Sequence, residues 1–327
     1  MQKKFRDNTN FKRNKMGFYF NSGGMGDYLN YLSAIYYALE NYPFNDYVLV
    51  VPEYLVELCR NALRKFPDLQ ILPHSQSLVL ESCLDVRRVK EETINATVTH
   101  LMDLGFIYYA RTNPVPEGYK YYLDLDLSDV KLHGSLKGKD YAVMTPCFTA
   151  DSRHMKAETF NKIKNYIIDL GLKPVFLGNQ KMKDISSGDG YVRSDKKISL
   201  RGGLNLINKT SVLEAAKVIE NSKFIVGLDN GLLHLGAMTK APVVFGYTIA
   251  SPIQRHPSRK HGSEVIDVVV SEDELACIHC QDKFRFLDSH QFRNCLYNDF
   301  KCLDLLNFEK FKAGIDRVYS PDFNLDL

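Results

Sequence analysis

The residues best suited to chemistry lie where short apolar runs end. Near the N-terminus, Gly23, Gly24 and Gly26 follow the apolar run 16–21 and lead into Asp27. Glycines let the backbone approach a ligand closely, and a carboxylate placed there can take a proton from an acceptor hydroxyl. Asp27 is therefore a candidate catalytic base, although the same residue could simply cap the helix that follows.

A second segment of this kind follows the apolar run 224–226. It contains Asp229, Asn230, Gly231 and His234. A helix beginning here would direct backbone N–H groups at an anion. The alternative is that the Asp or Asn is an ordinary helix cap and that the His is a core residue.

Two further apolar runs end in polar or glycine residues. Arg153 and His154 follow the run 141–144, and Gly178 follows the run 174–177. Cations beside a helix N-terminus suit a diphosphate, so these residues are also candidates for binding one. The alternative is that the Arg and His are exposed surface residues.

Four of the seven cysteines fall late in the chain, at Cys277, Cys280, Cys295 and Cys302. A Cys-x-x-Cys pair with two later thiols can form a tetrahedral zinc site, although the second pair is more widely spaced than in typical sites. The alternative is a set of reduced, buried thiols. An odd number of cysteines without an export signal argues against a disulfide framework.

The elements that must position these residues follow from hydrophobic periodicity. Apolar runs alternate with amphipathic stretches, which predicts β-strands joined by helices. Connections of this length make the strands parallel. The predicted strands are 16–21, 47–51, 69–72, 141–144, 174–177, 224–226 and 243–245, with helices at 54–65, 157–170, after Thr210 or Ser211, and near 303–318. In such sheets ligands bind beyond the carboxyl ends of the strands, where all the candidates above lie.

The bulk composition is that of an ordinary folded protein. With 327 residues the chain can form about two domains that each bury a core. Charged residues make up 25%, and no apolar run approaches the roughly 18 to 20 residues that a membrane span needs. Because the first residues also lack the apolar core of a signal peptide, we expect a soluble protein of the cytoplasm.

The net charge is +3, and cations crowd the first fifteen residues. We predict a basic tail at 1–16, which either holds a phosphate-rich surface or is a disordered, solubilising end. The pattern then predicts two Rossmann-like domains, 17–136 and 137–327. The second ends in the cysteine-bearing stretch and closing helices.

Three segments resemble those of glycosyltransferase family 9, the heptosyltransferases and related enzymes. They are the glycine-rich loop 23–29, the segment 152–160 and the Asp-Asn-Gly-x-x-His segment 229–237. The similarity spans about 17–302. The resemblance implies the GT-B architecture, an α/β fold in which two Rossmann-like domains face each other across a cleft. Three residues depart from the family pattern: Asn230 replaces a hydroxyl residue, Arg153 a lysine and Met155 a tryptophan.

The resemblance also implies a mechanism. A nucleotide-diphosphate sugar would bind the C-terminal domain through Arg153, His154, Gly178 and residues 229–234, while the N-terminal domain would bind the acceptor and supply Asp27 as the base. Transfer would be inverting and metal-independent, with no cofactor required. In agreement, the one Asp-x-Asp sequence near a strand end, 124–126, is predicted to be a polar loop.

Several alternatives stay open at this stage. The acceptor implied by the family is a glycan or the lipopolysaccharide core, which could place the protein at the inner membrane. The basic tail would equally suit DNA, as in phage enzymes that glycosylate hydroxymethylated bases in an infected host cytoplasm. A non-catalytic nucleotide-sugar binder and a nucleotide-sugar epimerase are further alternatives. The sugar, the nucleotide base and the oligomeric state are open.

Overall fold

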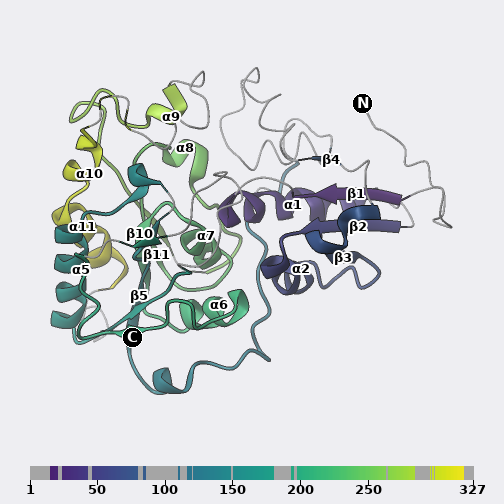
Figure 1. Ribbon diagram of the computed structural model, residues 1–327, viewed down its shortest axis with the longest axis horizontal. Helices are drawn as coiled ribbons and strands as arrows, with labels where there is room; N and C mark the ends of the chain where they lie inside the picture. The colour runs from purple at the N-terminus through teal and green to yellow at the C-terminus, as the bar shows by residue number, and fades with distance from the viewer. Residues whose placement is uncertain are drawn as a thin grey trace. The chain divides into compact units, whose positions relative to one another are not determined.

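The computed structural model describes most of the chain, and the text below concerns the described residues alone. These are 15–20, 24–42, 46–79, 84–85, 110, 116–119, 121–148, 150–179, 193–194, 197–262, 264–283, 295, 297 and 299–319. Most of the predicted basic tail and Gly23 lie outside them. The chain divides into two compact units, Met1–Asp126 and Leu127–Leu327, each described by itself (Figure 1). The domain boundary expected near residue 136 stays a prediction.

The first unit contains a four-stranded sheet in the order β3-β2-β1-β4. Its three strand pairings are all parallel. The strands are β1 (Lys15–Tyr19), β2 (Asp46–Val51), β3 (Gln70–Pro73) and β4 (Leu84–Asp85), and the helical elements are α1 (Met25–Asn41), η1 (Glu53–Leu55), α2 (Val56–Ala62) and η2 (His74–Val79). In α1, every residue from Gly26 to Ile35 is buried, so these turns of the helix are buried on all sides rather than along one stripe.

The second unit contains a six-stranded sheet in the order β12-β11-β10-β5-β7-β9. All five pairings are parallel. The strands are β5 (Tyr141–Met144), β7 (Lys173–Phe176), β9 (Leu204–Asn205), β10 (Ile225–Leu228), β11 (Val243–Gly246) and β12 (Val265–Val268). Numbered within the unit, this is the order 3-2-1-4-5-6 of a dinucleotide-binding sheet, whose direction of winding reverses between β5 and β10.

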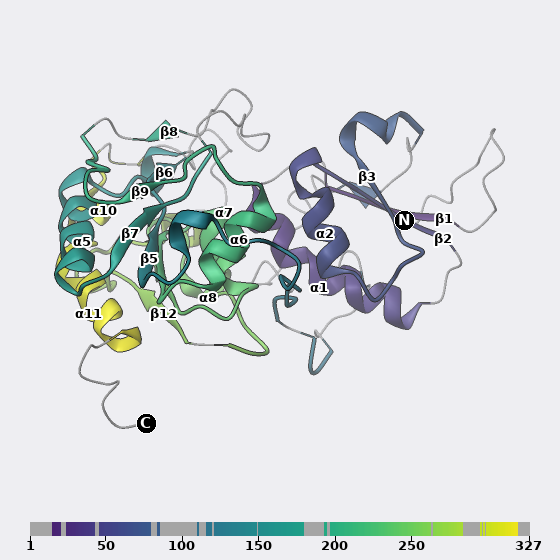
Figure 2. The same ribbon diagram turned by 90° about the horizontal axis from the view of Figure 1, so that it is seen from below.

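Helices cover both faces of this sheet. α5 (Ala157–Asp169) and α11 (Phe308–Val318) lie on one face, whereas α6 (Val212–Glu220) and α7 (Gly231–Ala237) lie on the other, in both views (Figures 1 and 2). The remaining elements are η4 (Gly134–Leu136), β6 (Cys147–Phe148) paired antiparallel with β8 (Arg193–Ser194), η5 (Asp151–Arg153), α8 (Pro252–Arg255), α9 (Cys280–Lys283) and α10 (Lys301–Leu305).

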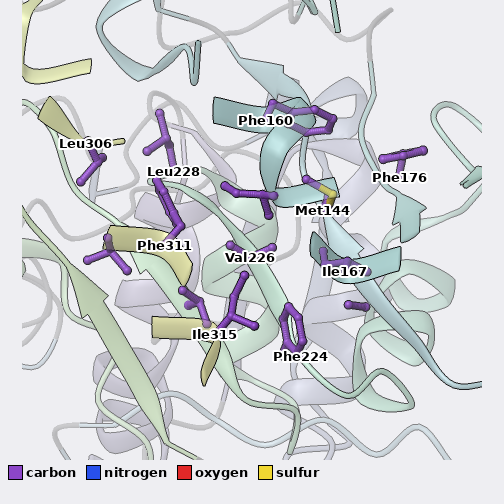
Figure 3. Close-up of a cluster of buried hydrophobic side chains, with 14 of the residues drawn as sticks. Met144, Phe160, Ile167, Phe176, Phe224, Val226, Leu228, Leu306, Phe311 and Ile315 are labelled. Carbon is purple, nitrogen blue, oxygen red and sulfur yellow. The ribbon is translucent and has the colours of Figure 1, made fainter. Parts of the chain in front are cut away.

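One hydrophobic cluster of the second unit lies between the sheet and the α5/α11 layer. Phe160 of α5, Phe224 beside β10 and Phe311 of α11 belong to one buried cluster, whose side chains converge in Figure 3. Burying each such side chain contributes roughly 1.5–3 kcal/mol, so this cluster fixes the sheet whose strand ends carry the candidate residues.

The predicted strands and the α/β fold class are confirmed, while one helix prediction differs in detail. The helix expected over 54–65 begins as the 3-10 turn η1 and ends with α2 at Ala62. The backbone of Leu63, which follows α2, is no longer helical, with φ −103° and ψ 23°. The closing helices expected near 303–318 are α10 and α11, and Asn307 caps α11 by accepting from the Lys310 N–H at 3.3 Å.

In the described part of the chain, no helix combines the length and apolar character that crossing a membrane requires.

Candidate active site

The reversal of winding in the second unit brings two candidate loops together. Thr145 follows β5 and Asn230 follows β10, and Asn230 Nδ2 donates to Thr145 Oγ1 at 2.8 Å. Asn230 Oδ1 also accepts from the N–H groups of Leu232 and Leu233, at 2.9 and 3.3 Å, and so caps α7. Where the strand order of such a sheet reverses, a crevice forms beyond the carboxyl ends of the two neighbouring strands. Ligands bind in this crevice in these folds.

A buried ionic cluster lies beside this crevice. Asp229 is 4% exposed, and His234 Nε2 lies 3.1 Å from its Oδ1. Arg153 Nη2 lies 3.6 Å from the other carboxylate oxygen, Oδ2. Because an ionised carboxylate only accepts hydrogen bonds, the imidazole must donate its Nε2 proton to Asp229.

The charge of Asp229 is stabilised by its neighbours. Although burial favours the protonated form, the pKa of this carboxyl lies well below its usual range, because Arg153, His234 and Arg255 stabilise the anion. Such a group stays ionised and is a poor proton acceptor. Asp229 therefore serves to hold the cations rather than to act as a general base.

Arg153 is the cation of this cluster that can meet a ligand. Its side chain is 23% exposed, whereas the Asp229 side chain is 5% exposed. A cavity of about 240 Å³ is lined by Arg153, Asn230, Thr145 and Phe148, together with six mainly apolar residues.

The other residues predicted for this region have local roles in the structure. His154 stacks on Phe148, with ring centroids 4.1 Å apart and planes 15° apart. A Cβ at Gly178 would lie 2.4 Å from Cys147 Sγ, so glycine is needed for Cys147, which lines the cavity, to fit. Gly231 begins α7, which spans seven residues. Contacts of these residues with a donor stay predictions.

Asp27 lies at the corresponding point of the first unit. It belongs to the first turn of α1, beyond β1, where the sheet order again reverses between β1 and β4. Its Oδ2 accepts from the Gly24 N–H at 2.8 Å, and the residue is 8% exposed. The helix-capping interaction proposed as the alternative is thus present, and the role as a base stays a prediction. Gly26 is buried in the same turn, and its carbonyl accepts from Asn30 Nδ2 at 2.8 Å.

The four late cysteines gather around a separate cavity of about 390 Å³, which Cys277, Cys280, Cys295 and Cys302 line together with His279. Burial, together with the neighbouring thiols of the group, raises the pKa of Cys302 to about 12. The described residues contain no group of three or more side chains arranged to hold a metal ion. The structure therefore brings the thiols together without a completed metal geometry.

Sequence patterns missed two residues of this region. Thr145 directly follows β5, and that position at a strand's carboxyl end was the available signal. Arg255 of α8 is 7% exposed and interacts electrostatically with Asp229. No local pattern distinguishes Arg255 from an ordinary surface arginine, because its burial depends on the fold of distant segments.

The family model described as glycosyltransferase family 9 (heptosyltransferase) matches residues 74–286, about two thirds of the chain. The chain belongs to glycosyltransferase family 9. It is a glycosyltransferase that uses a nucleotide sugar. The match contains the segments 152–160 and 229–237, whereas the glycine-rich loop 23–29 lies outside it. No curated protein matches the chain.

Three solved structures show the same fold as this family member. The iron-containing dodecameric glycosyltransferase TibC from enterotoxigenic E. coli H10407 has a TM-score of 0.69 and 16% identity, covering 93% of this chain and 76% of TibC. The glycosyltransferase family 9 protein from Veillonella parvula DSM 2008 has a TM-score of 0.56 and 11% identity, covering 93% and 97%. E. coli heptosyltransferase WaaC with ADP has a TM-score of 0.50 and 16% identity, covering 83% and 98%. These likenesses confirm the predicted GT-B fold class.

Proposed function

We propose that this glycosyltransferase transfers a sugar from a nucleotide-diphosphate sugar to a hydroxyl of a glycan, such as a lipopolysaccharide core, with inversion and without a catalytic metal. The observation that carries the proposal is the partly exposed Arg153 beside Asn230 and Thr145, at the point where the 3-2-1-4-5-6 sheet reverses. TibC, which shares the fold, has been solved in complex with ADP-D-β-D-heptose. A glycan acceptor also fits the heptosyltransferase relatives.

In the proposed reaction, the acceptor oxygen attacks the anomeric carbon of the donor while the bond from that carbon to the β-phosphate oxygen breaks. The leaving diphosphate keeps the electron pair of the broken bond, and Arg153 stabilises its growing charge. Asp27 takes the proton of the acceptor hydroxyl. Asp229 holds Arg153 in place from its buried side.

Arg153 is a more plausible anion ligand than the N-terminus of α7. The helix spans seven residues, and Asn230 already accepts from two of its first N–H groups. The guanidinium has several donors in a fixed plane, which suits two phosphate oxygens at once. Metal independence is supported by the Asp-x-Asp sequence at 124–126, because its two aspartates lie in irregular backbone rather than at the end of a strand.

The deciding experiment is a binding screen with ADP, GDP and UDP, followed by thermal unfolding. A nucleotide that binds only the folded protein stabilises it, by about 2.7 kcal/mol at a concentration of 100 times Kd. The melting temperature rises as a result. Arg153→Gln should weaken binding of the best nucleotide at least tenfold, whereas Arg201→Gln, at an exposed position of the same unit, should not. If no nucleotide stabilises the wild type, the proposed function is wrong.

DNA is the second candidate acceptor, favoured by the cluster of cations in the first fifteen residues. Binding to duplex DNA that weakens steeply with salt, together with transfer to hydroxymethylated bases, would identify it. If a variant without residues 1–14 transfers sugar to a glycan acceptor as fast as the full chain does, the result would argue for the glycan.

We infer a cytoplasmic location, either free or at the inner membrane.

We further propose that the four late cysteines hold a structural transition metal. The observation that favours this is their convergence on one cavity, and TibC is described as iron-containing. Thiolates suit zinc or iron in tetrahedral coordination, and such a metal would cross-link this loop-rich part of the chain. Elemental analysis should find close to one metal per chain, lost in Cys280→Ser and kept in Cys59→Ala, whose thiol lies in the first unit.

A further inference from the structure

The loop that follows β11 is held from one side by the cysteine-bearing segment, defined here as residues 277–283. Within this segment, the His279 N–H donates to the Thr248 carbonyl at 3.2 Å, and the Gln281 N–H donates to the Ile249 carbonyl at 2.9 Å. Asp282 Oδ2 accepts from the Ser251 N–H at 3.0 Å. Three successive contacts therefore attach the loop to this segment.

From its other side, the same loop holds the turn that carries Arg153. Thr248 Oγ1 donates to the Ser152 carbonyl at 2.8 Å, and both residues are buried, at 2% and 1% exposed. Ser152 directly precedes Arg153 in the turn η5, where the Arg153 N–H donates to the Ala150 carbonyl at 2.9 Å. The Thr248 hydroxyl thus connects the loop to the backbone next to the candidate anion ligand.

Two further observations support the same connection. Ser152, Thr248 and Ile249 line the cavity that the four cysteines surround, so the back of the Arg153 turn forms one wall of that cavity. Arg255 interacts electrostatically with both Asp229 and Asp282, which joins the ionic cluster to α9.

We infer that Thr248 is a positioning residue that ties Arg153 to the cysteine-bearing segment, so that the order of this segment sets how tightly the protein binds a nucleoside diphosphate. The inference rests on the proposed function, because it takes Arg153 as the cation that meets the diphosphate. Thr248 touches no ligand itself; it acts through the Ser152 carbonyl. Without a donor, that buried carbonyl would be unsatisfied and the turn would shift to reach another partner.

The test compares Thr248→Val, which has nearly the same shape but no hydroxyl, with Thr248→Ser, which keeps the hydroxyl. Calorimetric titration with ADP, GDP and UDP should show at least tenfold weaker binding of the best nucleotide for the Val variant, and binding within about twofold of wild type for the Ser variant. Hydrogen exchange of residues 150–156, measured without ligand, should quicken in the Val variant alone. Thr248→Ala replaces the Val variant if the latter fails to fold.

The contribution of the cysteine-bearing segment is tested by a Cys277→Ser/Cys280→Ser variant. It should weaken nucleotide binding and quicken exchange at 150–156, and adding Thr248→Val should cause little further loss, because both changes act through one contact. If the losses of nucleotide affinity in the combined variant are fully additive, the cysteine-bearing segment does not act through Thr248.

The outcomes separate the inference from the proposed function. If wild-type protein binds none of the three nucleotides, the proposed function fails, and the exchange of residues 150–156 still decides the role of Thr248. Equal exchange in the Val and Ser variants overturns the inference. A lower melting temperature of the Val variant with unchanged nucleotide affinity and unchanged exchange also overturns it, since the hydroxyl would then serve stability alone.

Discussion

At the scale of single residues, Asp229 is the centre of the candidate site. Its carboxylate meets His234 through Oδ1 and Arg153 through Oδ2, and these partners lower its pKa. A group whose pKa is lowered by folding stabilises the protein above its unfolded pKa of about 3.9, and this contribution is lost as the pH falls below that value. We therefore expect Asp229→Asn to destabilise the protein at pH 7 by about 3–5 kcal/mol, because it leaves a buried cation without its partner.

The pH dependence of unfolding supplies the check on this prediction. Denaturant titrations between pH 3 and pH 7 should show a smaller loss of stability on acidification for Asp229→Asn than for wild type, since the variant has no carboxylate to protonate. Parallel curves for the two proteins would contradict the assignment of an ionised Asp229.

Asp27 combines two roles that substitution can separate. Asp27→Asn keeps an oxygen that can accept from the Gly24 N–H, so the melting temperature should change little. Loss of a general base should lower the transfer rate by about 10²–10⁴-fold. Equal transfer rates of variant and wild type, once donor and acceptor are known, would leave Asp27 as a helix cap.

At the scale of elements, α7 depends on a side chain from outside the helix. Arg259 Nε donates to the Ala237 carbonyl at 3.1 Å, and Nη2 lies 2.6–2.8 Å from three more carbonyls at the end of α7 and just beyond it, those of Gly236, Thr239 and Ala241. This cation adds a charged donor to carbonyls at the end of the helix, of which that of Gly236 also accepts from the N–H and hydroxyl of Thr239. Its charge opposes the negative end of the helix dipole.

Removal of this guanidinium should therefore destabilise the second unit. We expect Arg259→Ala to cost roughly 1–3 kcal/mol or more, because several carbonyls lose a charged donor. Arg259→Lys should recover part of the loss, since one ammonium cannot reach all of these acceptors. Urea unfolding measures both, with exposed Arg201→Ala as the control, which should stay within about 0.5 kcal/mol of wild type. An Arg259→Ala variant as stable as wild type would show that packing and the Asn230 cap hold α7 without this guanidinium.

At the scale of the whole molecule, each of the two units has its own parallel sheet and buried core. Units with separate cores can unfold in separate transitions. In calorimetry of the full chain we expect two transitions. A bound nucleoside diphosphate should raise the temperature of the transition that belongs to the second unit.

Variants assign the two transitions. Leu58→Ala, in the core of the first unit, should lower the temperature of one transition, because such cavities typically cost roughly 2–5 kcal/mol of stability. Arg259→Ala should lower the temperature of the other transition. A nucleotide that raises the transition sensitive to Leu58→Ala would contradict the placement of the donor site in the second unit.

Local patterns in the sequence were enough to predict most helix positions, the α/β class and the strands β1, β2, β3, β5, β7, β10 and β11. They did not predict β4, β9 and β12 of the parallel sheets or the β6–β8 pair. Runs such as 141–144 and 224–226 are buried on both faces of the sheet, so they are apolar throughout and end abruptly at polar residues. The capping role open to Asn230 was also visible, because helix caps depend on residues within one turn.

The tertiary structure alone decided which strand ends meet. Thr145 and Asn230 lie 85 positions apart, and they touch because β5 and β10 pair in the sheet. Packing between segments remote in sequence also decides the burial of Arg255 and brings the cysteines together beside the Ser152 turn. The pairing of distant strands depends on the same packing. Periodicity reports how a segment faces its surroundings, whereas the identity of those surroundings is set by long-range contacts that no local pattern encodes.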